Sequence, residues 1–168
     1  ELGDIFQVVL SQRFEAKLTK KPIEIYKKLR VTNPSPFMFF FNFQDFQIIG
    51  ASPEILVRLR DNKITVRPIA GTRPRGKTAK EDLYYEKDLL NDKKELSEHL
   101  MLLDLGRNDA GKVSKINSVK VTESFIIERY SHVMHIVSNV IGEYNKKFSK
   151  FKSLLAGFPA GTVSGAPK

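Results

Sequence analysis

Cysteine is absent from the 168-residue chain, and long apolar runs are absent as well. Without cysteine there is no disulfide, no thiolate metal site and no cysteine nucleophile, and a reducing compartment is compatible with the sequence. The most apolar run, Phe37–Phe43, is far shorter than the ~20 residues of a membrane helix. Nothing at the start resembles a signal peptide. We therefore expect a soluble protein with no membrane partner.

Internal repeats, low-complexity linkers and the glycine-rich fingerprints of nucleotide-binding folds are also missing. The length of 168 residues and the hydrophobic content of 41% suit one globular domain. The first residue, Glu1, is not methionine, and the chain stops at "SGAPK" without a closing element. We therefore expect one domain over residues 1–168 that is truncated at both ends.

Positive charge is in excess, with 28 Lys and Arg against 19 Asp and Glu and a formal net charge of +9. Such a balance suits nucleic acid, an anionic membrane or an acidic metabolite. The lysines are scattered in pairs and do not form one basic tract, so charge alone does not choose among these partners.

Short strands arranged in hairpins are interrupted by few helices. The alternating and β-branched segments predict strands over 4–14, 37–43, 46–51, 55–61, 63–68, 115–121 and 133–144. Helices are predicted over 22–31, over 79–103 as one long helix closed by Gly106 and Asn108, and around 148–156. A second glycine-rich loop is expected over 157–168. This order predicts an α+β fold in which antiparallel β-sheets are flanked by helices.

The stretch "PIAGTRPRG", from Pro68 to Gly76, mixes prolines, glycines and arginines in a way that predicts a shaped loop. Gly71 and Thr72 would offer backbone N–H groups and a hydroxyl to a ligand. Arg73 and Arg75 would add positive charge suited to carboxylate or phosphate. A basic surface turn is the alternative, and a small anion is the ligand that this chemistry suits.

The predicted long helix carries two acids one turn apart, Glu95 and Glu98. Its core face is expected to be a stripe of leucines: Leu89, Leu96, Leu100 and Leu103. Both acids point away from that stripe, where two carboxylates at i, i+3 could share Mg2+. Solvated acids are the simpler interpretation.

Each of the three histidines has a functional and a structural interpretation. His132 and His135 are three residues apart in a predicted strand, so they project to opposite faces and at most one can enter a given pocket. His99 adjoins Glu98 and could be structural.

Four long motifs, "PIAGTRPRG", "EHLMLLDLGRND", "RYSHVMHIVS" and "FPAGTVSGAPK", closely resemble the chorismate-utilising enzymes, and among them the large, aminating subunits of anthranilate synthase. The resemblance runs over residues 3–168 and implies their fold, with chorismate, a small dicarboxylate, as substrate. It also implies conversion of chorismate and ammonia to anthranilate and pyruvate in tryptophan biosynthesis. Ammonia would come from glutamine through a glutamine amidotransferase subunit.

The resemblance implies catalytic roles for individual residues. Glu98 matches a ligand of the Mg2+ that holds the ring carboxylate of chorismate, and Glu95 matches a nearby acid. Glu54 matches the acid that assists departure of the C4 hydroxyl, which requires a pKa raised by burial. His135 matches the histidine beside the reacting ring that is implicated in the loss of pyruvate.

Substrate contacts are implied for Gly71 and Thr72, which match the chorismate-binding pair, and for Thr162. Isochorismate and salicylate synthases carry a lysine, acting as a base on water, where this chain has Gln7, and a glutamine cannot deprotonate water. Aminodeoxychorismate synthases often carry a nucleophilic lysine where Ala70 stands. Both positions favour amination to anthranilate.

The segment Pro36, Phe37 and Met38 matches the family's contact with the feedback inhibitor tryptophan. After "SGAPK" the family continues into a helix and strands that supply a second Mg2+ glutamate and an arginine for the substrate carboxylate. We therefore expect the 168 residues alone to be unable to turn over chorismate.

Three alternatives stay open. The first is aminodeoxychorismate synthase, which differs in its product, and the second is a non-catalytic interaction remnant. The third is a nucleic-acid-binding module, in which a basic, phenylalanine-rich sheet would stack on bases. It requires one strand's phenylalanines to be exposed beside lysines. We expect no nucleic acid, and these phenylalanines to be buried: Phe37, Phe39, Phe41 and Phe43.

Overall fold

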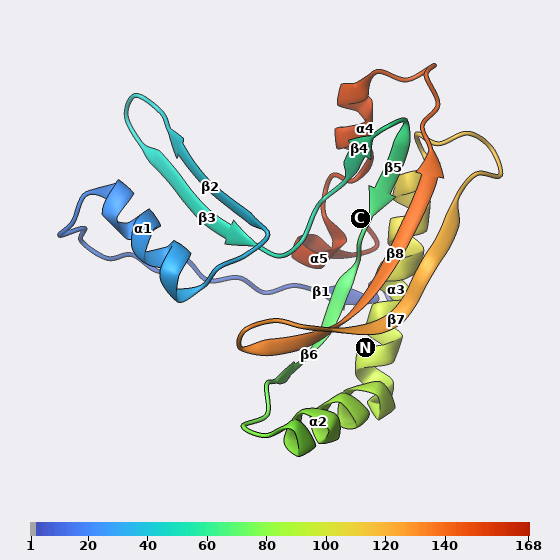
Figure 1. Cartoon of the computed structure of the whole chain (residues 1–168). Helices are drawn as coiled ribbons and strands as arrows, with labels where there is room; N and C mark the ends of the chain where they lie inside the picture. The colour runs from blue at the N-terminus through green and yellow to red at the C-terminus, as the bar shows by residue number, and fades with distance from the viewer. Residues whose placement is uncertain (1–2) are drawn as a thin grey trace. The chain divides into compact units, whose positions relative to one another are not determined.

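The computed structural model describes residues 3–168 as helices and antiparallel strands in two compact units, which confirms the expected α+β class (Figure 1). Within the described residues, one unit contains residues 3–9 and 56–168 and the other contains residues 10–55. Glu1, which motivated the expectation of a truncated start, lies outside the described residues. None of the helices within residues 3–168 combines the length and apolar character needed to cross a membrane.

The larger unit is built on a five-stranded antiparallel sheet whose central strand is β8 (Val133–Glu143). Strand β7 (Lys120–Arg129) pairs with β8 over most of its length. Strands β5 (Lys63–Val66) and β6 (Ile69–Pro74) pair with the two ends of β8, and β4 (Arg58–Arg60) continues the sheet beyond β5 (Figure 1). A separate two-residue pairing joins β1 (Gln7–Val8) to β9 (Gly165–Ala166).

Helix α3 (Lys93–Gly111) packs against this sheet through a face that differs from the expected leucine stripe. Its buried residues include a series at the spacing of one helix face: His99, Leu103, Gly106 and Ala110. Leu100 is 58% exposed, so the predicted core face is wrong at that position. Leu103 packs with Ile64 and Val140 in a core cluster. Burying one such aliphatic side chain stabilises the fold by about 1.5–3 kcal/mol.

The predicted helix over 79–103 is wrong in its extent, because two helices occupy this region. Helix α2 (Ala79–Asn91) ends before Asp92, whose carboxylate accepts hydrogen bonds from the backbone N–H groups of Lys94 and Glu95 and caps α3. Gly106 lies inside α3 and does not end it. A Cβ there would lie 3.2 Å from the Pro68 side chain, so this glycine allows α3 to pack closely on the sheet.

The predicted loop from Pro68 to Gly76 is mostly strand β6, so that prediction is wrong. Gly71 has φ +75°, and the pairing of β6 with β8 shifts register between Ala70 and Thr72. Glycine at a bulge and proline at the margin of a sheet are both compatible with a strand. The segment is therefore a bulged strand of the sheet.

The smaller unit contains helix α1 (Pro22–Thr32) and a hairpin of β2 (Phe37–Asn42) and β3 (Gln47–Ser52), as predicted. The Tyr26 ring of α1 lies 5.8 Å from the ring of Phe40, so α1 covers one face of the hairpin. None of the described residues 10–55 is fully buried.

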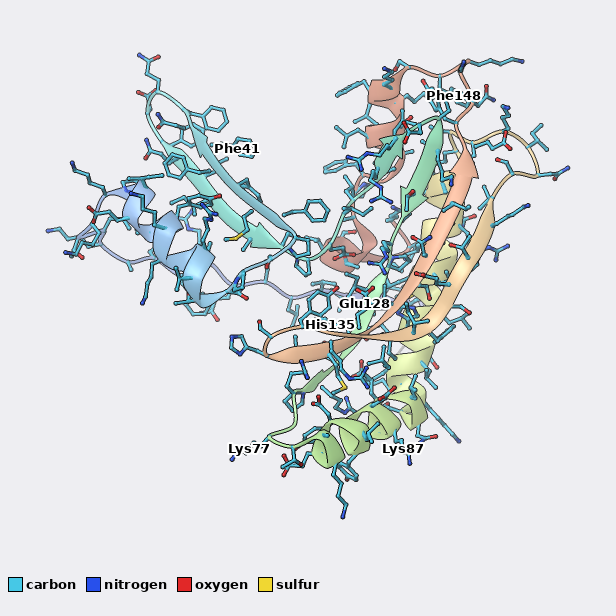
Figure 2. All side chains as sticks on the ribbon, viewed as in Figure 1. Phe41, Lys77, Lys87, Glu128, His135 and Phe148 are labelled. Carbon is cyan, nitrogen blue, oxygen red and sulfur yellow. The ribbon has the colours of Figure 1, made fainter. Side chains whose placement is uncertain are left out.

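The other face of the hairpin is aromatic. The rings of Phe39 and Phe41 stack with centroids 5.3 Å apart, and Figure 2 shows Phe41 on β2. The prediction that the strand's phenylalanines are buried is wrong at Phe37, Phe41 and Phe43, because the one helix of this unit covers only the opposite face. Residues 37–52 include neither Lys nor Arg, so the hairpin's own strands supply no phosphate-binding cations beside these rings.

The remaining segments follow the predictions in part. The strand predicted over 4–14 is confined to β1, and Leu10 and Phe14 are exposed. Strand β7 starts later than predicted and extends to Arg129. The turn between β4 and β5 has positive φ at Asp61 and Asn62, as a tight hairpin requires. Helix α4 (Lys150–Ala156) is confirmed, whereas the expected glycine-rich loop after it contains helix α5 (Gly161–Ser164) and β9.

Candidate functional site

Glu98 on α3 and Gln7 on β1 are joined although 91 residues separate them. The Gln7 side chain donates from Nε2 to Glu98 Oε1 at 2.7 Å. Strand β1 is held in place by β9, since the backbone N–H of Phe6 donates to the Ala166 carbonyl at 3.0 Å. Glu98 is half-buried, so the expectation that it simply faces solvent is wrong.

The amide of Gln7 has a fixed orientation at this contact. A carboxylate only accepts hydrogen bonds unless it is protonated, so the NH2 group must be the one that faces Glu98. The amide oxygen Oε1 then points elsewhere. It is buried, and it has no hydrogen-bond partner among residues 3–168.

His135 lies opposite Thr72 in the pairing of β8 with β6. Its Nδ1 is 3.0 Å from Thr72 Oγ1 and 3.2 Å from the carbonyl oxygen of Gly71. Because the carbonyl can only accept, a hydrogen bond to it requires the proton on Nδ1, which leaves Nε2 of a neutral imidazole as an acceptor. The bulge at Gly71 therefore brings a backbone carbonyl oxygen and the Thr72 hydroxyl within hydrogen-bonding distance of His135 Nδ1.

A polar cluster not predicted from the sequence lies beside His135. Glu128 on β7 is its partner in the register with β8, and Figure 2 shows both residues on adjacent strands. Burial alone would raise the pKa of Glu128, but hydrogen bonds from Arg67 and Tyr130 lower it. The Tyr130 ring is also edge-on to His135, with centroids 5.4 Å apart. The sequence pattern did not predict this cluster, because it indicated a strand that ends at residue 121, before Glu128 and Tyr130.

The arginines of the "PIAGTRPRG" segment are engaged by acids of the helices. Arg73 donates from Nε to Asp88 at 2.5 Å and from Nη2 to Asp92 at 2.8 Å. Glu95 lies 3.8 Å from the same guanidinium. The hydrogen bond from Arg73 lowers the pKa of Asp92.

Arg75 is paired in a similar way, with Asp82 and with the Tyr130 carbonyl oxygen. Arg73 therefore links β6 to α2 and to the start of α3, and Arg75 links the segment after β6 to α2. Neither arginine offers unpaired positive charge to an anion, which corrects that expectation.

Glu54 follows β3 in the smaller unit and is half-buried. Its backbone N–H donates to Ser52 Oγ at 3.2 Å. Burial raises the pKa of Glu54 to about 7, which is the property that a proton donor near neutral pH needs.

Two histidines behave differently from His135. His132 is exposed in the turn before β8. His99 is fully buried, with Nε2 2.7 Å from Ser138 Oγ, and burial lowers its pKa to about 4. A neutral histidine that joins α3 to β8 fits the structural interpretation of His99.

The other expected site residues are dispersed. Thr162 is half-buried in α5, which packs on α3. Ala70 precedes the bulge in β6. Pro36 is exposed before β2, while Phe37 and Met38 are adjacent on β2 and face opposite sides of the hairpin.

The surroundings of Glu98 fit Mg2+ in their chemistry. Mg2+ prefers oxygen ligands and is usually held by one or two carboxylates together with waters and substrate groups. Glu98 supplies a half-buried carboxylate whose second oxygen is not engaged by Gln7. No group of three or more His, Asp or Glu side chains that could hold a metal occurs within residues 3–168, and Mg2+ does not require one.

The chain belongs to the chorismate binding enzyme family, which matches residues 1–168. It is 69% identical over 99% of its length to anthranilate synthase component 1 of Cereibacter sphaeroides. The resemblance inferred from the four motifs is thereby confirmed.

Two solved structures extend this comparison. Anthranilate synthase component I from Streptococcus pneumoniae has a TM-score of 0.89 and 49% identity over 99% of this chain and 36% of its own. The menaquinone-specific isochorismate synthase from Escherichia coli has a TM-score of 0.62 and 21% identity over 72% of this chain and 27% of its own, which shows a shared fold. The chain spans about a third of the length of the curated relatives it matches.

Proposed function

We propose that the chain is the chorismate-binding portion of an anthranilate synthase large subunit, a lyase that converts chorismate and ammonia to anthranilate and pyruvate. The high identity to the Cereibacter sphaeroides protein supports this assignment. The structural observation that carries it is the hydrogen bond between Gln7 and Glu98. The side chain beside the candidate metal ligand is an amide, which cannot activate water as a base but suits a nucleophile that needs no activation.

Glu98 would hold Mg2+, with Glu95 close by, and the ion would supply positive charge that binds and orients the ring carboxylate of chorismate. Glu54 donates a proton to the departing C4 hydroxyl, because a carboxyl group with a pKa near 7 is still partly protonated at neutral pH. His135 accepts or holds a proton at Nε2 during the loss of pyruvate.

Gly71, Thr72 and Thr162 would contact chorismate, and Ala70 supplies no amine nucleophile at its position. Pro36, Phe37 and Met38 would contribute to a site for the feedback inhibitor tryptophan. Ammonia would be delivered by a glutamine amidotransferase subunit, in the cytoplasm and as part of tryptophan biosynthesis. Catalysis would need segments beyond these 168 residues, as the relatives are about three times as long.

Replacing Glu98 by glutamine tests the proposed site. The gene product that contains this chain is assayed with chorismate, ammonium and Mg2+, and the product is identified by mass. We expect anthranilate from the parent protein and at least a 100-fold lower kcat/KM for Glu98→Gln, because a neutral amide binds Mg2+ weakly. The control Glu24→Gln, at an exposed position of α1, should stay close to the parent.

Two results would contradict the proposal. A parent protein that forms aminodeoxychorismate, or no product, would refute the assignment to anthranilate synthase. Parent-like activity of Glu98→Gln at limiting Mg2+ would refute the metal role of Glu98.

A further inference from the structure

His135 is flanked by one residue from each neighbouring strand. It lies directly opposite Thr72 on β6 and directly opposite Glu128 on β7 (Figure 2), so the three side chains share one face of the sheet. The ring of Tyr130, which follows β7, lies edge-on to the imidazole with ring centroids 5.4 Å apart. The imidazole therefore has a hydrogen-bonding contact with β6 and an aromatic contact with the end of β7.

The polar contacts of His135 do not fix its ring by themselves. Its contacts with Thr72 Oγ1 and with the Gly71 carbonyl oxygen both involve Nδ1. A ring held at one atom can still tilt about that atom, which moves Nε2, the nitrogen that handles the proton in the proposed function. The edge contact with Tyr130 restricts this tilt, because edge-to-face packing favours one orientation of the two rings.

The hydroxyl of Tyr130 is anchored by an ion pair. It donates to Glu128 Oε2 at 2.7 Å, and the same carboxylate accepts hydrogen bonds from Nη1 and Nη2 of Arg67. Hydrogen bonds to ionised groups are stronger than those between neutral groups. The side chains of Arg67 and Glu128 are both partly buried, so salt and water screen this pair less than an exposed one.

The backbone of Tyr130 is also fixed. Its N–H donates to the Val133 carbonyl oxygen at 2.8 Å and closes the turn between β7 and β8. Its own carbonyl oxygen accepts from Nη1 of Arg75 at 2.7 Å, and Arg75 is paired with Asp82 on α2. The Tyr130 ring is therefore held at both ends, by the turn and Arg75 at its backbone and by Glu128 at its hydroxyl.

We infer that Tyr130 is a positioning residue that holds the imidazole of His135 in place during the loss of pyruvate, and that Glu128 and Arg67 hold Tyr130. This inference rests on the proposed function. A group that transfers a proton must lie within hydrogen-bonding reach of it, and a displacement of about 1 Å can cost about 100-fold in rate. The proposed amination step uses Glu54 and not His135, so loss of Tyr130 should slow the second step selectively.

The two steps leave different compounds, which separates them in an assay. Amination joins chorismate and ammonia with loss of water and keeps the enolpyruvyl group on the ring. In the second step a ring C–H bond breaks, its proton goes to a base, and its electron pair completes the aromatic ring. The ring C–O bond breaks with it, and enolpyruvate leaves with that electron pair and gains a proton to become pyruvate. A slow second step therefore releases an aminated compound that still carries the enolpyruvyl group.

Tyr130→Leu tests the inference because it removes the aromatic ring and keeps an apolar side chain. The gene product that contains this chain is assayed with chorismate, ammonium and Mg2+; products are quantified by mass, and chorismate binding is measured by calorimetry. We expect anthranilate formation to fall at least about tenfold, with Kd for chorismate unchanged and the aminated enolpyruvyl compound accumulating. The control Tyr84→Leu, at an exposed position of α2, should give the product ratio of the parent.

Tyr130→Phe guards against a folding defect, because it keeps the ring and removes only the hydroxyl that Glu128 holds. It should accumulate the same compound to a smaller extent, at an unchanged midpoint of thermal unfolding. A parent-like product ratio in Tyr130→Leu would overturn the inference, as would the same ratio in Tyr130→Phe if Tyr130→Leu does not fold. Equal decreases in chorismate consumption and anthranilate formation, without release of the aminated compound, would assign Tyr130 to the stability of the sheet alone. A parent protein that makes no anthranilate would instead refute the proposed function.

Discussion

The proposed role of Glu54 as proton donor to the departing hydroxyl requires a protonated carboxyl group, and its surroundings favour that form. Burial raises its pKa from an ordinary value of 4.5 to about 7 in the folded protein. The protonated, active form is therefore populated below about pH 7 and is lost as the pH rises through that value. Neither the identity of the residue nor its place in "SPE" contains this information.

We expect kcat of the parent enzyme to fall as the pH rises above about 7, at saturating chorismate and a fixed concentration of free ammonia. In Glu54→Gln the rate should be at least 100-fold lower and should lose this dependence, because glutamine has no proton to give up. A profile from pH 6 to 9 for both proteins checks this. If Glu54→Gln retained the same fall above pH 7, another group would be responsible for it.

Among the secondary-structure elements, the two-residue pairing of β1 with β9 positions Gln7 beside Glu98. Gly165 has φ +99°, and a Cβ there would collide with the backbone carbonyl of Gln7. Only glycine allows the two chains to approach this closely. The glycine in "SGAPK" therefore places Gln7 against Glu98, although it touches neither the amide nor the carboxylate.

Gly165→Ala should separate β1 from β9 and withdraw Gln7 from Glu98. We expect a loss of stability of about 1–3 kcal/mol from strain at positive φ, together with at least a tenfold lower kcat/KM for chorismate, because Gln7 would no longer hold the Glu98 carboxylate. Urea unfolding and steady-state kinetics measure the two effects.

Gly111→Ala is the matched control, because a Cβ at that end of α3 meets no atom within 4 Å and alanine favours helix. It should be neutral or stabilising. Gly165→Ala with parent-like stability and kinetics would show that the close approach at Gly165 is not required.

At the scale of the whole molecule, the two compact units differ in how much they bury. Residues such as Ile136, Val137 and Val140 on β8 are completely buried, whereas none of the described residues 10–55 is. Local stability follows buried apolar contacts, so the unit of residues 10–55 should open at a lower free energy than the sheet around β8.

Hydrogen exchange of the 168-residue chain followed by mass spectrometry measures this difference. We expect amides of the β2–β3 hairpin, residues 37–52, to exchange at least about 100-fold faster than those of β8. Peptides from β2–β3 and from β8 are also exchanged in denaturant. Their rates there correct each region for the intrinsic exchange rate of its sequence. Equal protection of the two regions would mean that the chain unfolds as one cooperative unit.

Sequence patterns correctly predicted the class of fold, the two hairpins, helix α1 and strand β8, because alternation, helical periodicity and turn residues act within a few positions of the chain. Its long motifs also identified the family. Local patterns predicted other features wrongly, because contacts with distant segments or a capping side chain determined them. Gly106 has the character of a helix terminator but serves close packing, and Asp92 divides a helix that periodicity predicts as continuous.

Which chemical groups come into contact depends on the folded arrangement of the chain. Gln7 and Glu98 are 91 residues apart, and their contact depends on the approach of β9 to β1. The contact of His135 with the Gly71 carbonyl oxygen depends on the bulge in β6, and the pKa of Glu54 depends on its burial. These properties arise from distances between segments that are remote in the sequence, which no local pattern of residues specifies.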